Sequence, residues 1–190
     1  MLDQRIKGLY GISPNNNLNI ALIKRVFSEN TINIFQYRHK TQNEELKLEE
    51  AKKLLELCRH HNTLFIINDD INLCEKIGAD GVHLGQNDID LNSARIKLGA
   101  NFIIGISCHN SLKLAIEAEN NGADYIALGA IFKSNTKPNA INCSLSEILN
   151  IKNNINIPIV GIGGITFENQ QSALDAGCDS IAMVEGLFGH

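Results

Sequence analysis

Short apolar runs alternate with longer amphipathic segments along the chain. Each run is at most seven residues long, and most are rich in Ile, Val or Phe. Runs of this length and composition are typical of strands that are buried on both faces of a parallel sheet. The expected strands are Gly8–Ser13, Ile32–Arg38, Thr63–Asp69, Gly81–Gly85, Phe102–Ser107, Tyr125–Ile131, Pro158–Gly164 and Ser180–Val184.

The segments between these runs have helical periodicity. In Glu44–Arg59, apolar residues recur on one stripe while Lys and Glu occupy the rest of the surface. Asn110–Asn121 and Phe167–Ala176 follow the same pattern, and Asp70 is placed to cap the helix that follows it. Glycine supplies the left-handed residue that ends a helix, and one joint recurs where a helix ends and a strand begins. Its copies are Gly78-Ala79-Asp80, Gly122-Ala123-Asp124 and Gly177-Cys178-Asp179.

This repetition indicates one βα unit used eight times. Eight such units predict an α/β fold of the (β/α)8 TIM-barrel class, as a single compact domain over residues 1–190. The length allows about 24 residues per unit, against about 31 in a ~250-residue barrel, so no second domain is expected. An open doubly wound sheet is the alternative. It is disfavoured because the alternation runs unbroken from residue 8 to residue 184.

Composition and charge narrow the range of partners. The net charge is −4 with a pI near 5.8, so no global basic field attracts nucleic acid or an anionic membrane. No apolar run approaches the ~20 residues that span a bilayer, and the first residues lack an apolar secretory signal. The five scattered cysteines argue against a disulfide framework or a zinc site. We therefore expect a cytoplasmic protein that acts on small molecules.

Cations and an amide cluster at the end of the second expected strand, as Gln36-Tyr37-Arg38-His39-Lys40. The active sites of (β/α)8 barrels lie at the carboxyl ends of their strands. Side chains alternate along a strand, so Gln36, Arg38 and Lys40 share one face, and Tyr37 and His39 share the other. If the first face is the barrel mouth, it can bind phosphate. The alternative is a strand end that is charged only because water reaches it.

Carboxylates follow the next two strands. Asp69 ends the third strand and Asp88 follows the fourth, and adjacent strands of a barrel bring them towards one another. Two carboxylates beside two cations favour a Mg²⁺ site, because Mg²⁺ prefers one or two carboxylates together with phosphate oxygens. The fifth strand adds Ser107 and His109, for which a helix cap and a structural histidine are the ordinary alternatives.

A second anion site is expected from the last three strands. The segment after the sixth strand, 132–138, carries hydroxyls and lysines that suit a loop closing on phosphate, although a solvated loop fits them equally well. After the seventh strand, the glycines at 161, 163 and 164 let backbone N–H groups approach a phosphate, where barrels commonly bind one. Val184 and Glu185 follow at the same rim. The mouth is therefore predicted to hold a metal-bound diphosphate and a monophosphate.

Six motifs in sequence order resemble those of the thiamine-phosphate synthase (thiamine-phosphate diphosphorylase) family. The resemblance runs from about Gly8 to Phe188, and the six motifs together are highly specific. They are Gln36-x-Arg38-x-Lys40, Asn68-Asp69-Asp70, His83-Leu84-Gly85-Gln86-x-Asp88, Gly105-x-Ser107, Ser134-x-Thr136-Lys137 and Gly161-Ile162-Gly163-Gly164-Ile165-Thr166.

The resemblance implies a transferase of thiamine biosynthesis. It would condense 4-amino-2-methyl-5-(diphosphooxymethyl)pyrimidine with 4-methyl-5-(2-phosphooxyethyl)thiazole to give thiamine phosphate and diphosphate, by a dissociative displacement assisted by Mg²⁺. The implied metal ligands are Asp69 and Asp88. The implied catalytic residues are Arg38, Lys40, Ser107 and Lys137. The implied substrate ligands are Gln36, Tyr37, Arg38, His39, Lys40, Asn68, Ser107, Ser134, Asn135, Thr136, Lys137, Gly164, Val184 and Glu185.

The chain departs from the family pattern at three places. Ala130 and Lys133 stand where the family usually has prolines, and Glu185 stands where a serine is common. Much of the family's first and last helices is lacking, which bears on stability and on packing into a homo-oligomer. The nearest rival is the related thiazole tautomerase, an isomerase that has no use for a metal–diphosphate pair. A non-catalytic thiamine-phosphate-binding protein and a phosphosugar isomerase barrel are more distant alternatives.

Overall fold

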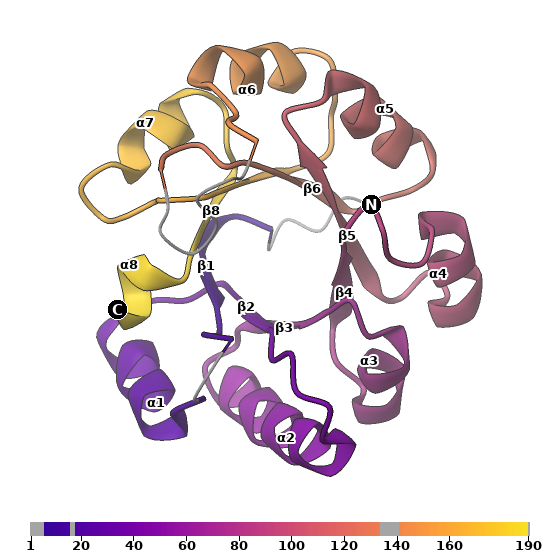
Figure 1. Cartoon of the computed structure of the whole chain (residues 1–190), viewed down its shortest axis with the longest axis vertical. Coiled ribbons are helices and arrows are strands. Elements are labelled where there is room, and N and C mark those ends of the chain that lie inside the picture. The colour runs from indigo at the N-terminus through magenta and orange to yellow at the C-terminus, as the bar shows by residue number, and fades with distance from the viewer. Residues whose placement is uncertain (1–5, 16–17, 134–140, 190) are drawn as a thin grey trace.

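Eight parallel strands close into a barrel, and the helices surround it (Figure 1). The computed structural model describes residues 6–15, 18–133 and 141–189. The strands are β1 (Gly8–Ile12), β2 (Ile34–Tyr37), β3 (Leu64–Asn68), β4 (Gly81–Leu84), β5 (Ile103–His109), β6 (Tyr125–Leu128), β7 (Ile159–Ile162) and β8 (Ser180–Met183). β8 pairs with β1, with Ser180 opposite Gly8, so no open edge remains. The predicted (β/α)8 TIM-barrel class is confirmed.

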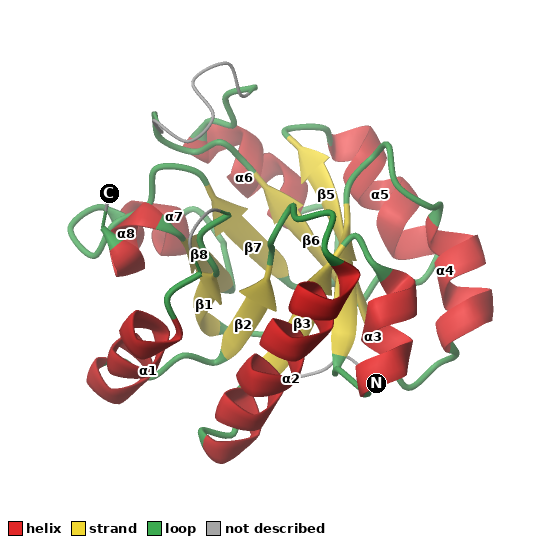
Figure 2. Cartoon of the chain, turned by 60° about the horizontal axis from the view of Figure 1, so that its bottom comes forward, coloured by secondary structure: helices red, strands yellow, loops and turns green. Residues whose placement is uncertain are grey.

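A helix follows each strand and packs on the outside of the barrel (Figure 2). The helices are α1 (Ile20–Glu29), α2 (Glu44–His60), α3 (Ile71–Ile77), α4 (Leu91–Leu98), α5 (Leu112–Asn120), α6 (Leu145–Lys152), α7 (Gln170–Asp175) and α8 (Glu185–Phe188). Within the described ranges, none of them is long and apolar enough to cross a membrane.

Local side-chain chemistry sets where two of the predicted helices begin. α5 starts two residues later than the pattern indicated, because the side chain of Ser111 accepts the backbone N–H of Leu114 and caps it. α7 starts at Gln170. Before it, Asn169 Oδ1 accepts the backbone N–H of Thr166 at 2.9 Å, which holds residues 166–169 in a turn. Apolar periodicity therefore located these helices but overestimated their lengths.

Side chains alternate between the interior of the barrel and the layer beneath the helices. On β2, Ile34 belongs to the interior apolar cluster, and Phe35 belongs to the cluster between strands and helices. The next two residues continue the alternation, with Gln36 lining the interior cavity and Tyr37 in the outer cluster. The interior cluster fills the lower part of the barrel, and its upper part is left for polar residues.

The repeated Gly-x-Asp joints connect neighbouring strands at the amino end of the barrel. In each joint, Oδ2 of the aspartate accepts a backbone N–H near the start of the preceding strand. The pairs are Asp80 with Phe65 (2.8 Å), Asp124 with Ile104 (2.8 Å) and Asp179 with Ile159 (2.9 Å). Two of these aspartates also pair with a cation, Asp124 with Arg95 and Asp179 with Lys152. The joints therefore fix strand positions at the end of the barrel away from the mouth.

Candidate active site

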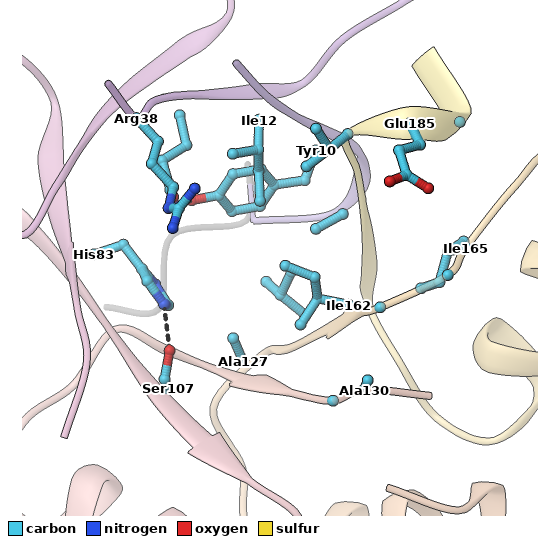
Figure 3. A pocket seen from close by; sticks show the side chains of 18 of the residues that line it. Tyr10, Ile12, Arg38, His83, Ser107, Ala127, Ala130, Ile162, Ile165 and Glu185 are labelled. Atoms are coloured by element: carbon cyan, nitrogen blue, oxygen red, sulfur yellow. Dashed lines mark hydrogen bonds between the residues drawn. The ribbon is translucent and has the colours of Figure 1, made fainter. Parts of the chain in front are cut away.

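A cavity of about 570 Å³ opens at the carboxyl ends of the strands (Figure 3). Polar side chains at the ends of β2 to β5 line one part, and glycines and apolar residues from β6 to β8 line the rest. A smaller cavity of about 270 Å³, lined partly by Lys40 and Asp69, adjoins it, and Asn68 lines both. The predicted site residues that line the larger cavity are Gln36, Arg38, Asn68, Ser107, Gly164, Val184 and Glu185.

Arg38 and Lys40 extend the inward face of β2 beyond its end. The backbone N–H of Arg38 donates to Ser13 Oγ at 2.8 Å, and the backbone N–H of Lys40 donates to Asn15 Oδ1 at 3.1 Å. These bonds attach the cation-bearing segment to the residues that follow β1. Both side-chain charges act to lower the pKa of Asp69, but burial and Asp88 raise it by more. The two cations and this carboxylate therefore lie within electrostatic reach of one another.

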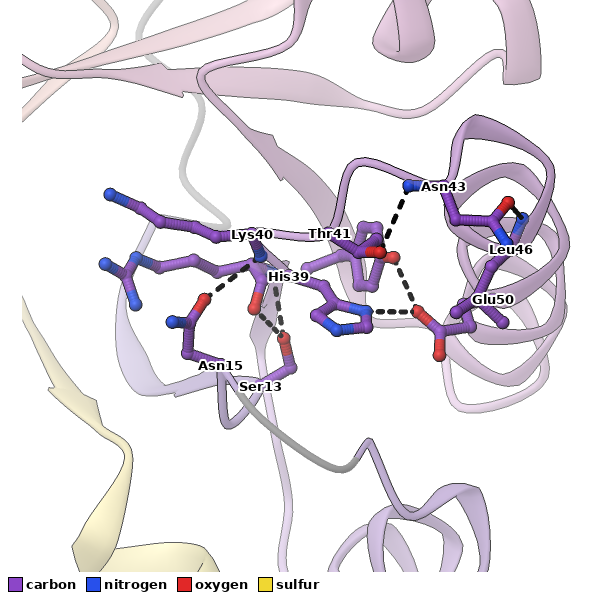
Figure 4. Close-up of polar contacts among 10 residues, drawn as sticks. Ser13, Asn15, His39, Lys40, Thr41, Asn43, Leu46 and Glu50 are labelled. Carbon is purple, nitrogen blue, oxygen red and sulfur yellow. Dashed lines mark hydrogen bonds and ion pairs between the residues drawn. The ribbon is translucent and has the colours of Figure 1, made fainter.

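Tyr37 and His39 take the opposite direction, as the alternation predicted. Tyr37 Oη donates to Glu50 Oε2 at 2.7 Å, and His39 Nδ1 lies 2.7 Å from the same oxygen (Figure 4). Burial and the Glu50 carboxylate raise the pKa of Tyr37. In Figure 4 the side chain of Lys40 points away from Glu50, whereas that of His39 points towards it. Tyr37 and His39 thus attach β2 to α2. Both also line the smaller cavity beside Lys40 and Asp69, and their implied role in substrate binding stays a prediction.

Asp69 and Asp70 have different partners although they are adjacent. Asp70 caps α3, because its Oδ1 accepts the backbone N–H of Leu73 at 2.9 Å, and this prediction is confirmed. Asp69 has a left-handed backbone with φ of 63° and its carboxyl group hydrogen-bonds Asp88. Oδ2 of Asp88 also accepts the backbone N–H of Gly85 at 2.7 Å. The structure therefore brings together the two carboxylates that the sequence singled out.

Burial and the neighbouring Asp88 carboxylate raise the pKa of Asp69 to about 6. Burial is the largest cause, and the hydrogen bond and the charge of Asp88 follow. Two carboxylates at one point, with cations nearby, are a donor set that fits a divalent ion, which needs few protein ligands when phosphate supplies the others. No cluster of three or more His, Cys, Asp or Glu suited to a metal is found in the described part of the chain.

Asp69→Asn is expected to stabilise the metal-free protein at pH 8. The folded pKa of about 6 exceeds the unfolded value near 3.9, so the free energy of unfolding falls as the pH rises between these values. Removing the charge should raise Tm by a few degrees, or about 1 kcal/mol after allowing for solvent screening. Thermal melts with a chelator at pH 8 and pH 4 test this. The increase in Tm should vanish at pH 4. An equal increase in Tm at both pH values would contradict the prediction.

Ser107 is held in the cavity by its neighbours on β4 and beyond. Its hydroxyl lies 2.9 Å from His83 Nε2, and its backbone carbonyl accepts from Gln86 Nε2 at 2.6 Å. His83 is buried and its ring stacks on that of Tyr125. His109 follows on the same strand and is exposed, with φ of 55°. His83 is thus the histidine that contacts a predicted ligand, although sequence reasoning gave it no role.

Two buried tyrosines were also overlooked in the sequence. Tyr10 and Tyr125 lie inside the barrel with their hydroxyls 2.9 Å apart, and Gln36 Nε2 donates to Tyr10 Oη at 2.7 Å. Each interrupts an apolar strand, and a buried tyrosine hydroxyl requires a hydrogen-bond partner. That requirement was the available signal, but it does not identify the partner.

Backbone groups form the rim on the side of β7. Gly163 and Gly164 have φ of 102° and 61°, in the left-handed region that favours glycine. A Cβ on Gly164 would lie 2.3 Å from the carbonyl oxygen of Lys133, so no other residue fits without a backbone shift. Asn169 Nδ2 donates to the carbonyl of Gly164 at 2.9 Å and holds the turn. The turn therefore packs closely against the backbone of Phe132 and Lys133, and the approach of its N–H groups to a phosphate stays a prediction.

The start of α8 completes this rim. Val184 and Glu185 line the cavity together with the glycine turn, and Figure 3 shows the side chain of Glu185 there. The implied ligands Ser134, Asn135, Thr136 and Lys137 lie outside the described residues, so their positions remain predictions.

Comparisons with known proteins agree with this geometry. A family model described as thiamine monophosphate synthase matches residues 9–187. The chain is 45% identical over 188 residues to a thiamine-phosphate synthase of Nitrosospira multiformis, covering 98% of this chain and 80% of that protein. It is 43% identical over 192 residues to a protein of the same name from Nitrosococcus oceani, covering 98% of this chain and 88% of that protein.

Solved structures give the same result. Thiamine phosphate pyrophosphorylase from Pyrococcus furiosus has a TM-score of 0.87 at 29% identity, covering 98% of this chain and 89% of that one. A 3-hexulose-6-phosphate synthase reaches a TM-score of 0.67 at 14% identity, covering 97% of this chain and 92% of that one. The second likeness concerns the barrel fold alone.

Proposed function

Because the chain belongs to the thiamine monophosphate synthase family, we propose that it joins 4-amino-2-methyl-5-(diphosphooxymethyl)pyrimidine to 4-methyl-5-(2-phosphooxyethyl)thiazole. The products are thiamine phosphate and diphosphate, and the enzyme is a transferase. The observation that carries the proposal is that two different sets of anion-binding groups meet at the carboxyl end of the barrel. Two cations and two carboxylates stand together at the ends of β2 to β4, beside the smaller cavity, and a glycine turn that suits phosphate lines the larger cavity that adjoins it.

The reaction exchanges one bond for another at the pyrimidine methylene. The C–O bond to diphosphate breaks and its electron pair leaves with the diphosphate, while the aminopyrimidine ring stabilises the cationic carbon. The thiazole nitrogen then forms the C–N bond. No side-chain nucleophile is needed, so the protein has to orient two substrates and balance the charge that develops on the leaving group. Arg38 and Lys40 are the cations placed to do so.

Asp69 and Asp88 are the residues that would hold Mg²⁺. Burial and the Asp88 carboxylate raise the pKa of Asp69, and a divalent ion there would relieve the repulsion between the two carboxylates. Two carboxylates leave most of an octahedral set to water and substrate oxygens, as is usual for Mg²⁺ beside phosphates. Bound there, the ion would supply positive charge to the departing diphosphate.

The thiazole phosphate is assigned to the opposite rim. Backbone N–H groups at Gly164, Val184 and Glu185 are the donors proposed for the monophosphate, because glycine turns and helix N-termini present such groups to anions. The Glu185 carboxylate repels a phosphate, so only the backbone of this residue can serve. The hydroxyls of Ser134 and Thr136 would complete this site by the resemblance. With this assignment the thiazole would lie on the far side of the pyrimidine from the diphosphate, which suits displacement at the methylene carbon.

The direct test supplies the purified protein with both substrates and Mg²⁺. Thiamine phosphate and diphosphate should appear in equal amounts, and omitting either substrate or chelating the metal should stop both. Incubation with the thiazole alone tests the tautomerase alternative. If both substrates bind without release of diphosphate, the proposed reaction is wrong.

Arg38→Ala and Thr136→Ala should separate the two substrate sites. Arg38 lines the cavity beside the carboxylates, so its loss should raise KM severalfold for the pyrimidine diphosphate and little for the thiazole phosphate. Thr136→Ala should raise KM severalfold for the thiazole phosphate and little for the pyrimidine diphosphate. Steady-state kinetics with each substrate varied in turn measure this. A KM that changes for the other substrate in each variant would mean that the two sites are assigned backwards.

A further inference from the structure

Five polar side chains from five strands form a hydrogen-bonded chain in the lining of the larger cavity. Gln36 Nε2 lies 2.7 Å from Tyr10 Oη, which lies 2.9 Å from Tyr125 Oη. Tyr125 Oη is 3.0 Å from His83 Nδ1, and His83 Nε2 is 2.9 Å from Ser107 Oγ. The first and last members, Gln36 and Ser107, are implied substrate ligands, and the three between them are buried. Figure 3 shows the final link between His83 and Ser107.

The direction of the first bonds follows from counting protons. Gln36 Nε2 can only donate, so Tyr10 Oη accepts from it. Tyr10 has one hydroxyl proton and, among the described residues, one other partner, Tyr125. An unpaired hydroxyl in a fully buried position would be costly, so Tyr10 donates to Tyr125.

The same count leads on to the cavity. Tyr125 accepts from Tyr10, so its own proton goes to Nδ1 of His83. A neutral imidazole that accepts at Nδ1 carries its proton on Nε2, which faces Ser107 Oγ. Ser107 therefore accepts from His83, and its own proton remains available to a ligand in the cavity.

We propose that Tyr125 and His83 are positioning residues that keep the Ser107 hydroxyl as a hydrogen-bond donor towards the leaving diphosphate. The identity of the ligand rests on the proposed function. The proton order, meaning which partner donates in each hydrogen bond from Gln36 to Ser107, rests on the hydrogen bonds alone. A donor aimed at oxygens that gain charge as the C–O bond breaks stabilises the transition state more than the bound substrate. In the reverse order, Ser107 would donate to His83 and would present only lone pairs to an anion.

Nuclear magnetic resonance of the histidine rings measures the proton order directly. In wild-type protein labelled with nitrogen-15 histidine and free of substrate, His83 should be the Nε2–H tautomer, its signals being assigned by their loss in His83→Gln. An Nδ1–H ring would overturn the proposal whether or not the protein is active. If the ring is Nε2–H but no thiamine phosphate forms, the proposed function fails and the proton order stands.

Two matched variants separate positioning from packing. Tyr10→Phe and Tyr125→Phe each remove one buried hydroxyl, but only Tyr125 gives its proton to His83. Tyr125→Phe should produce a mixture of His83 tautomers and lower kcat about fivefold with both substrates saturating, whereas Tyr10→Phe should keep the tautomer and most of the turnover. Equal losses of kcat with an unchanged tautomer in both variants would overturn the proposal.

Coupling to Ser107 completes the test. Because the hydroxyl of Tyr125 is inferred to act through Ser107, Tyr125→Phe should have no further effect on kcat in a Ser107→Ala background. Additive losses in the double variant would show that Tyr125 acts by another route and would overturn the assignment.

Discussion

Asp69→Asn is expected to lower the rate of thiamine phosphate formation by at least an order of magnitude. The variant keeps the shape of the side chain and its hydrogen-bonding capacity, and asparagine tolerates the left-handed backbone at this position. It removes half of the charge proposed to hold Mg²⁺ beside the leaving diphosphate. Asp88→Asn should have a similar effect. Initial rates at saturating substrates over a range of Mg²⁺ concentrations measure the loss.

The neighbouring residue provides the matched control. Asp70→Asn removes a carboxylate one position away, but asparagine also caps helices well, so α3 should be retained. This variant should keep close to the wild-type rate. An Asp69→Asn variant that kept the full rate at limiting Mg²⁺ would refute the metal assignment. Since the same substitution is expected to raise Tm without metal, a slower and more stable enzyme would indicate a site that sacrifices stability for function.

Gly105→Ala is expected to destabilise the protein strongly. Gly105 lies on β5, and a Cβ there would sit 2.0 Å from the ring carbon Cζ of Tyr125. The ring of Tyr125 is fully buried, and its hydroxyl is hydrogen-bonded to Tyr10 and His83. The ring therefore cannot move without breaking these contacts. We expect a loss of about 3 kcal/mol, which corresponds to a fall in Tm of about 10 °C.

Thermal melts of single and double variants test the steric cause. Tyr125→Leu removes the ring that the new methyl group would meet, so Gly105→Ala should cost much less in that background than in the wild type. If the cost of Gly105→Ala were the same in both backgrounds, contact with the ring of Tyr125 would not be its cause.

The fold could be predicted because its determinants are local. Strand alternation has a fixed period of two, so the shared face of Gln36, Arg38 and Lys40 followed from their places in the run, whereas the inward direction of that face was left open. The helix cap at Asp70 and the repeated Gly-x-Asp joints involve residues that are close in sequence or recur at every unit. Helix starts were less certain because they depend on individual caps such as Ser111.

The polar contacts of the site could be predicted only in part. The meeting of Asp69 and Asp88 followed from the adjacency of β3 and β4. The shared attachment of Tyr37 and His39 to Glu50 depends on how α2 rotates against β2, which a single sequence does not specify. The link from Tyr10 to the tyrosine on β6 joins residues 115 positions apart. It exists only because a closed barrel places the strands face to face.

Closure between β1 and β8 also determines when the enzyme becomes competent during its synthesis. Ser180 Oγ donates to the carbonyl of Gly8 at 2.9 Å across a separation of 172 residues. Until β8 has left the ribosome, the nascent sheet has two bare edges and one wall of the catalytic chamber is missing. Such long-range pairing slows folding and prolongs exposure of those edges. Ribosome-bound chains that stop short of β8 should therefore engage chaperones but not substrates.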